Sequence, residues 1–159
     1  LEARGLDVTS IDISPLSTKA RTLHGARHSI CADIFTASFD FKFDTILLLM
    51  NGLGIAGKLS NLSTLLLRCK SLLSPGGKIL ADSSDLCYLF DDDEDFSTND
   101  LNTYYGEVDF NMVYGKCKGK SFDWLYVDFD TLKGIAHTWQ LEATKLVEGE
   151  HFDYLAEIK

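Results

Sequence analysis

A short apolar segment that ends in an acid and leads into a helix start constrains the fold of this chain more than any other feature. Residues 7–13 read Asp-Val-Thr-Ser-Ile-Asp-Ile, and their apolar members are β-branched, as in buried strands. Ser14 is a good helix N-cap, and Pro15 suits the first helical position. Asp12 is therefore predicted at the carboxyl tip of a strand. In an open parallel α/β sheet that tip faces the ligand crevice, where an acid accepts hydrogen bonds from ribose hydroxyls.

Strand-like and helix-like segments alternate along the rest of the chain, which predicts a three-layer α/β fold. Leu16, Ala20 and Leu23 recur at helical spacing. Residues 44–51 form a nearly unbroken apolar run, typical of a central parallel strand covered on both faces. The predicted strands are 7–13, 29–35, 44–51, 78–83, 107–114, 122–129, 140–148 and 153–158, and the predicted helices are 14–25, 58–74 and 131–138.

Composition narrows the class of protein. A length of 159 residues favours one domain, spanning residues 1–159, with a sizeable core. The net charge of −9 argues against nucleic acid or an acidic membrane surface as a partner. No apolar run is long enough to cross a membrane, and the four cysteines are scattered without paired spacing. We therefore expect a reduced, cytoplasmic protein.

An acidic run at residues 91–95 invites a metal interpretation. As a calcium loop beginning at Asp91 it fails, because Phe96 stands where the turn glycine is required and Asn102 stands where the bidentate glutamate is required. The run is predicted to be a solvated loop, and no metal site is predicted. The four histidines lie at no spacing that indicates a catalytic base.

Three blocks of sequence carry a family resemblance. Residues 8–15 contain the strand, the acid and an Asp-x-Ser-Pro ending; residues 31–35 read Cys-Ala-Asp-Ile-Phe; and residues 72–80 read Leu-Leu-Ser-Pro-Gly-Gly-Lys-Ile-Leu. In this order and spacing, the chain resembles the class I, Rossmann-like S-adenosylmethionine-dependent methyltransferases. The resemblance implies a doubly wound, mostly parallel sheet flanked by helices, with an antiparallel C-terminal hairpin. A β-hairpin at about 107–129 is an insertion into that pattern.

The resemblance also implies a cofactor, S-adenosylmethionine, and residues that bind its adenosine. Asp12 would hold the ribose hydroxyls, and Ile13 would lie against the adenine ring. Asp33 would meet the adenine amino group, with Ile34 beside the ring. Each has a structural alternative: Asp12 as an acid stabilised by a helix dipole, Ile13 as a core residue and Asp33 as a turn cap.

The glycine-rich loop at residues 51–57 follows the predicted central strand, which lines the methyl-transfer site in the family. Asn51 and Leu53 are therefore expected to contact the cofactor, and Asn51 could orient a heteroatom of the substrate. The alternative is a glycine turn that tight strand-to-helix geometry requires.

One part of the family pattern is missing from the sequence. The family's first strand, with its Gly-x-Gly-x-Gly loop, would precede Leu1. Without it, the predicted strands form two groups separated by unpaired edges. We expect the gap to be closed by direct pairing, by a second copy of the chain in a homodimer, or by residues outside this sequence.

The predicted function is S-adenosylmethionine-dependent methyl transfer to a small-molecule or protein acceptor. Such transfer depends mainly on positioning, so no catalytic residue is predicted. A nicotinamide-dependent oxidoreductase is one alternative, because that class also places an acid after its second strand. A non-catalytic, truncated scaffold domain is the other.

Overall fold

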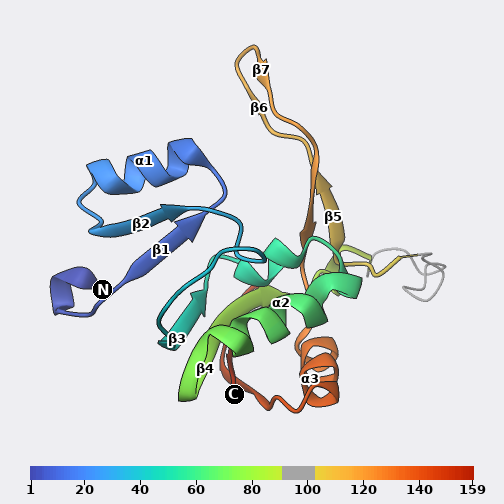
Figure 1. Cartoon of the computed structure of the whole chain (residues 1–159). Coiled ribbons are helices and arrows are strands. Elements are labelled where there is room, and N and C mark those ends of the chain that lie inside the picture. The colour runs from blue at the N-terminus through green and yellow to red at the C-terminus, as the bar shows by residue number, and fades with distance from the viewer. Residues whose placement is uncertain (91–102) are drawn as a thin grey trace. The chain divides into compact units, whose positions relative to one another are not determined.

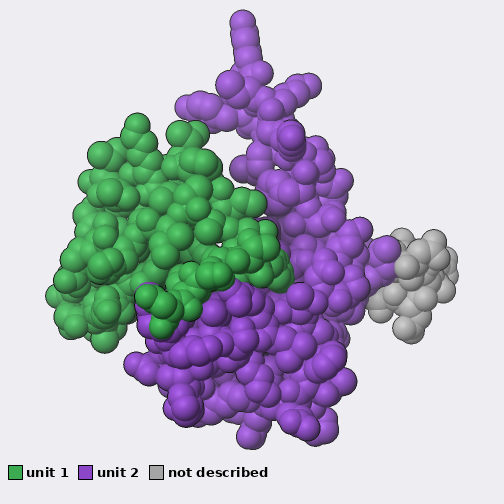
Figure 2. Space-filling view, viewed as in Figure 1, with its two compact units in different colours: residues 1–40 green, residues 41–159 purple. Residues whose placement is uncertain are grey.

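The computed structural model describes residues 1–90 and 103–159 (Figure 1). The described chain divides into two compact units, Leu1–Asp40 and Phe41–Lys159 (Figure 2). The acidic run at residues 91–95 and the calcium-loop test made on it lie outside the described residues. No helix in the described part of the chain is both long enough and apolar enough to span a membrane.

The first unit is a strand–helix–strand unit with a parallel two-stranded sheet. Its elements are η1 (Glu2–Arg4), β1 (Thr9–Asp12), α1 (Pro15–Leu23) and β2 (His28–Cys31). β1 and β2 run parallel, with Asp12 opposite Cys31. The side chain of Ser14 accepts a hydrogen bond from the Ser17 backbone N–H at 3.2 Å, and Pro15 is the first helical residue. The predicted strand, acid and helix cap are thus confirmed.

The apolar spacing in α1 located the helix but not its buried face. Leu16 and Leu23 are 79% and 78% exposed, and no α1 residue is fully buried. The half-buried face instead carries Ser17 and Arg21, whose side chains both donate to the carboxylate of Asp12. These polar contacts, rather than leucine burial, set which side of α1 faces its strands.

The second unit contains a four-stranded mixed sheet in the order β3–β4–β10–β9. Its strands are β3 (Phe43–Leu48), β4 (Leu73–Ser84), β9 (Ala143–Glu148) and β10 (Asp153–Ile158). β3 is parallel to β4, whereas β10 is antiparallel to both β4 and β9. The predicted antiparallel C-terminal hairpin is confirmed.

β3 lies at the edge of this sheet, and most of its residues are partly or fully exposed in the described chain, whereas a strand covered on both faces was predicted. Among the described residues it pairs only with β4, and Leu47 remains 40% exposed. Within the described ranges, no strand follows β3 on the other side of this sheet, as expected for a sheet split into two groups. What pairs with that edge stays a prediction.

α2 (Leu59–Leu72) supplies much of the core of the second unit and packs against β4 (Figure 1). It was predicted over residues 58–74, and its apolar stripe is confirmed. The helix ends at Leu72 because Leu73 has an extended backbone and begins β4. The fully buried side chains of α2 are Leu62, Leu65, Leu66, Cys69 and Leu72.

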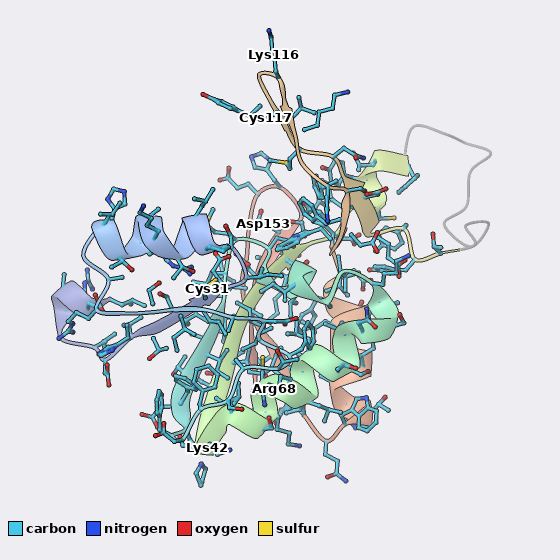
Figure 3. All side chains as sticks on the ribbon, turned by 45° about the horizontal axis from the view of Figure 1, so that its top comes forward. Cys31, Lys42, Arg68, Lys116, Cys117 and Asp153 are labelled. Atoms are coloured by element: carbon cyan, nitrogen blue, oxygen red, sulfur yellow. The ribbon has the colours of Figure 1, made fainter. Side chains whose placement is uncertain are left out.

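The inserted hairpin projects from the second unit as a long β-ribbon (Figure 1). β5 (Glu107–Phe110) pairs with β8 (Phe122–Leu125), and β6 (Val113–Tyr114) pairs with β7 (Cys117–Lys118), both antiparallel as predicted. Lys116 and Cys117 lie at its tip (Figure 3). The second arm ends before residue 129, because α3 (Phe129–Thr138) begins there, capped by the carboxylate of Asp128. Two short 3₁₀ helices, η2 (Gly52–Ala56) and η3 (Cys87–Phe90), complete the unit.

Candidate functional site

Asp12 ends β1, and its carboxylate accepts hydrogen bonds from the N-cap residue Ser14 and from Ser17 and Arg21 of α1. Its Oδ1 accepts from the Ser14 backbone N–H at 2.8 Å. Its Oδ2 accepts from the Ser17 hydroxyl at 2.6 Å and from Arg21 Nη1 at 3.3 Å. Partial burial acts to raise the pKa of Asp12, but hydrogen bonds from Ser17 and Ser14 and the charge of Arg21 outweigh it and lower that pKa. Asp12 is therefore an ionised acceptor.

The number of hydrogen bonds that the Asp12 carboxylate can still accept bears on its predicted role. A carboxylate offers about four acceptor positions, two on each oxygen. The described hydrogen bonds use two positions on Oδ2 and one on Oδ1 of Asp12. One further donor can join at Oδ1, whereas holding two ribose hydroxyls requires Ser17 or Arg21 to move.

The other predicted residues of the first unit differ in exposure. Ile13 follows Asp12 and is 75% exposed, which excludes the alternative of a core residue. Ile34 is half-buried. Asp33 lies beyond the end of β2, where its carboxylate accepts from the Phe35 backbone N–H at 2.9 Å. Asp33 thus caps a turn, as its structural alternative stated, and its exposed carboxylate keeps further acceptor positions.

In the second unit, β3 ends in a turn with an unusual backbone. Met50 and Asn51 are consecutive non-glycine residues in the left-handed region, with φ of 63° and 56°. Three backbone N–H groups of this turn donate to the carboxylate of Asp82 on β4: Asn51 at 2.7 Å, Met50 at 3.1 Å and Gly52 at 3.4 Å. Asp82 reaches the turn because Leu48 pairs with Ala81, which places Asp82 one residue further along.

The Asn51 side chain is already engaged within the second unit. Its Nδ2 donates to the Leu125 carbonyl at 3.2 Å, and its Oδ1 accepts from the Ser83 hydroxyl at 2.7 Å. Ser83 is buried, and its oxygen also accepts from the Val127 backbone N–H at 3.0 Å. Leu53 is fully buried, with none of its surface exposed. Asn51 and Leu53 therefore fix the loop, and their predicted contact with a cofactor stays a prediction.

The glycine-rich loop also has a steric requirement. A Cβ atom placed on Gly54 would lie 2.0 Å from Nε1 of Trp124. The indole of Trp124, on β8, therefore covers the loop at a position that admits no side chain. The inserted ribbon and the loop after β3 are packed together within one unit.

A second polar cluster lies at the end of β4 and the start of α3. The Tyr104 hydroxyl donates to Asp128 at 2.6 Å, and the Tyr105 hydroxyl donates to Asp85 at 2.7 Å. Burial, with the hydrogen bond to Asp128, raises the pKa of Tyr104, so its proton stays in place at neutral pH. A cavity of about 140 Å³ adjoins the cluster. It is lined by Asp85, Asp128, Phe129, Asp130, Lys145, Glu148, Phe152 and Tyr154.

Sequence reasoning missed Met50, Asp82 and the Asp85–Asp128 cluster. The signal for Asp82 was available, because it follows the apolar stretch that ends at Ala81, just as Asp12 follows an apolar strand. No pattern of neighbouring residues indicated the left-handed turn at Met50. Within the described ranges, no group of three or more metal-ligating side chains is placed to hold a metal ion.

Comparison with known proteins identifies the class to which this fold belongs. No protein-family model matches the chain, and no curated protein matches it. Among solved structures, an S-adenosylmethionine-dependent methyltransferase from Bacteroides fragilis, in complex with S-adenosyl-L-homocysteine, is 46% identical over 100% of this chain, with a TM-score of 0.90. The chain spans 65% of the length of that protein.

More distant structures show the same fold. The CcbJ methyltransferase from Streptomyces caelestis is 9% identical over 99% of this chain and 76% of its own, with a TM-score of 0.68. The sugar N-methyltransferase KedS8 from a Streptoalloteichus species is 13% identical over 96% of this chain and 70% of its own, with a TM-score of 0.62. The chain has the class I, S-adenosylmethionine-dependent methyltransferase fold. The resemblance that its sequence motifs indicated is confirmed.

Proposed function

We propose that this protein transfers a methyl group from S-adenosylmethionine to a small-molecule or protein acceptor. The single observation that carries the proposal is the 46% identity, along the whole chain, to a methyltransferase solved with S-adenosyl-L-homocysteine. Because the chain spans 65% of that protein, the activity proposed is that of the whole protein. The net charge of −9 favours an acceptor other than nucleic acid.

The described residues fit such a donor. Asp12 is ionised and keeps one acceptor position on Oδ1, which suits a ribose hydroxyl. Ile13 presents an exposed apolar side chain beside it, suited to an adenine ring. Asp33 and Ile34 would contact the adenine edge and ring in the same unit. In the second unit, the loop that contains Asn51 and Leu53 would line the donor site.

The chemistry requires little of the protein beyond placement. When bound, S-adenosylmethionine supplies a methyl carbon made electrophilic by the adjacent sulfonium. The residues named above would orient the donor, so that an acceptor atom can approach in line with the methyl group. A general base is needed only where the acceptor atom carries a proton to be lost. The proposal therefore assigns binding roles to these residues and assigns no catalytic base.

Calorimetric titration tests the proposal. The protein is titrated with S-adenosylhomocysteine and, separately, with a nicotinamide dinucleotide. We expect saturable binding of S-adenosylhomocysteine alone, weakened about tenfold to a hundredfold by Asp12→Asn, since a charged acceptor is worth about 1.5–3 kcal/mol. Asp7→Asn, at the other end of the same predicted strand, is the matched control and should bind normally.

The other outcomes separate the alternatives. Binding of the dinucleotide but not of S-adenosylhomocysteine would establish the oxidoreductase. Binding of neither, by a protein that circular dichroism shows to be folded, would favour a scaffold domain. If Asp12→Asn and Asp7→Asn bind S-adenosylhomocysteine equally well, the assignment of Asp12 is wrong.

A further inference from the structure

The tip of the inserted ribbon is exposed on both of its faces. Every residue from Asn111 to Asp123 is exposed, so no other described part of the chain buries either face. Met112 and Val113 are each 60% exposed, and Tyr114 is 90% exposed. A two-stranded ribbon alone is marginally stable in water, and its apolar side chains contribute stability only when something covers them. The ribbon tip therefore carries apolar surface that the described chain leaves uncovered.

The base of the ribbon joins this tip firmly to the second unit. Phe110 and Phe122 stack with their ring centroids 5.8 Å apart, and Phe122 meets the ring of Trp124 edge-on at 6.2 Å. Trp124 in turn lies against Gly54, in the loop after β3. These contacts anchor the ribbon, so its tip is a built extension of the second unit (Figure 1).

The charge of the tip is opposite to that of the rest of the chain. Residues 111–121 contain three lysines, Lys116, Lys118 and Lys120, and no acid. All twenty-four Asp and Glu residues and the other twelve Lys and Arg residues lie elsewhere, so the chain total of −9 consists of +3 at the tip and −12 outside it. None of the three lysines forms an ion pair with a described residue. Carboxylates of another molecule would supply their partners.

The lysines alone explain only part of this tip. Lysine on an exposed strand edge keeps that edge from pairing with other chains, and this role needs no partner. It does not account for Met112, Val113 and Tyr114, whose apolar surface lies in water beside the lysines. A tyrosine among charged side chains is instead typical of a protein–protein interface, where an aromatic anchor is buried within a polar rim. The tip therefore fits a partner that offers apolar surface surrounded by carboxylates.

This chain itself offers such a surface. Phe152 is 57% exposed and lines the cavity at the end of β4 together with Asp130 and Glu148, which are also exposed. Of the eight residues that line this cavity, four are acids and one is a lysine. A basic tip and an acidic remainder on one chain make two copies complementary, and opposite charges steer them together. Nucleic acid is disfavoured as the partner, because the charge of −12 outside the tip would repel it.

We propose that the ribbon tip, residues 111–121, docks on the acidic surface of a second copy of this chain and so makes the protein a homodimer. Tyr114 is the apolar anchor, and the three lysines pair with carboxylates of the other copy. In a two-fold dimer each copy supplies one tip and receives one, so the contact is made twice. The proposal goes beyond methyl transfer and involves neither donor nor acceptor. It also uses a different surface from the unpaired edge of the sheet at β3.

Sedimentation equilibrium of the whole protein, without ligand, measures the Kd of the dimer. We expect a reversible dimer whose Kd rises about tenfold between about 50 mM and 500 mM NaCl, since salt screens exposed charges. Tyr114→Ser should raise the Kd about tenfold or more, because buried tyrosines are frequent interface hot spots. Lys116→Glu combined with Lys118→Glu should raise it at least as much, because like charges would then meet. The melting temperature of the dilute monomer should not change, since these side chains are exposed in it.

Matched controls carry the same chemical changes on other exposed residues. Leu23→Ser removes an apolar side chain that is 78% exposed on α1. Lys19→Glu combined with Lys133→Glu reverses two exposed charges, one on α1 and one on α3. Both control proteins should dimerise with the Kd of the original protein. Their net charges match those of the ribbon variants, so a general effect of charge on association is accounted for.

Cross-linking identifies the surfaces that meet. Unlabelled and ¹⁵N-labelled protein are mixed and treated with a carbodiimide, which joins a lysine amine directly to a neighbouring carboxylate. We expect peptides of mixed isotope content that link Lys116, Lys118 or Lys120 to an Asp or Glu outside the tip. Lys133, which is equally exposed to the reagent, should give no mixed-isotope link.

The remaining outcomes overturn the proposal. A protein that stays monomeric up to about 1 mM, the weak end of the affinity scale, has no such dimer. A dimer whose Kd is the same in the ribbon variants and their controls forms through another surface. A monomeric protein that binds a labelled oligonucleotide, and loses that binding in Lys116→Glu with Lys118→Glu, uses its tip for nucleic acid. Titration with S-adenosylhomocysteine is read separately, so this proposal and the proposed function fail independently.

Discussion

Gly54→Ala gives the sharpest test of how the inserted ribbon fixes the loop after β3. Gly54 is buried, and its φ is not positive, so its backbone accepts an alanine without strain. The obstacle is the indole of Trp124, three atoms of which would lie 2.0, 2.2 and 2.4 Å from the added Cβ. Ordinary carbon contacts are about 3.5–4.0 Å, so the ring must retreat by about 1.5 Å.

The expected magnitude follows from that displacement. Overpacking of a well-packed site costs about 1–3 kcal/mol, and the loss of unfolded-chain entropy offsets about 0.4–1 kcal/mol of it. We expect a net loss of about 1–2 kcal/mol in the free energy of unfolding. For a chain of this size that lowers the melting temperature by roughly 2–8 °C. Urea denaturation, with the slope m checked for constancy, measures the loss.

Two further variants make the prediction refutable. Gly134→Ala, in α3, meets no atom within 4 Å and should instead stabilise the protein by about 0.5–1 kcal/mol. In a Trp124→Ala background the obstacle is gone, so Gly54→Ala should cost nothing there. If Gly54→Ala is harmless in the original protein, or equally costly in both backgrounds, the steric explanation is wrong.

Four other predictions concern the core and the polar cluster of the second unit. Asp128→Ala should destabilise the protein by about 1–2 kcal/mol in urea denaturation, because α3 loses its N-cap and Tyr104 loses its acceptor. Burial acts to raise the pKa of Asp128, but hydrogen bonds from Thr131 and Tyr104 outweigh it and lower that pKa. The stabilisation that the ionised Asp128 contributes is therefore present above about pH 4 and is lost as the pH falls through the lowered pKa. Urea denaturation at several pH values between about 3 and 7 measures this loss. Burial raises the pKa of Cys69 to about 12, so a thiol reagent at pH 8 should label exposed Cys117 in the native protein and Cys69 only after unfolding. Leu66→Ala should cost about 2–5 kcal/mol, since Leu66 is fully buried, and a loss under 1 kcal/mol in urea denaturation would contradict its place in the core.

Local signals predicted the elements of the fold correctly. The Ser14 cap, the leucine stripe of α2 and the closing pair of strands each depend on residues within a few positions of one another. The burial of β3 could not be predicted in the same way, because it depends on which segments pack against the faces of the sheet, which a run of apolar residues does not reveal. The apolar spacing of α1 did not predict its buried face for a related reason. The residues of this helix that face inward are those that donate to Asp12, which lies on another element.

The residues of the candidate site also differ in whether the sequence alone could predict their place. Asp12 was predictable because its strand, its own side chain and its helix cap are consecutive in the sequence. The contact between Asp82 and the turn at Met50 was not, because 32 positions separate the two residues and only the register of β3 against β4 brings the carboxylate to the turn.

The sequence by itself determined which segments become strands and helices and which methyltransferase fold they build, because backbone propensity, capping and apolar period act over short stretches of chain. Only the tertiary structure decided which polar groups satisfy one another, which apolar side chains stay in solvent, and where backbone strain is held. Those outcomes depend on strand register and on packing between distant segments, which no local pattern encodes.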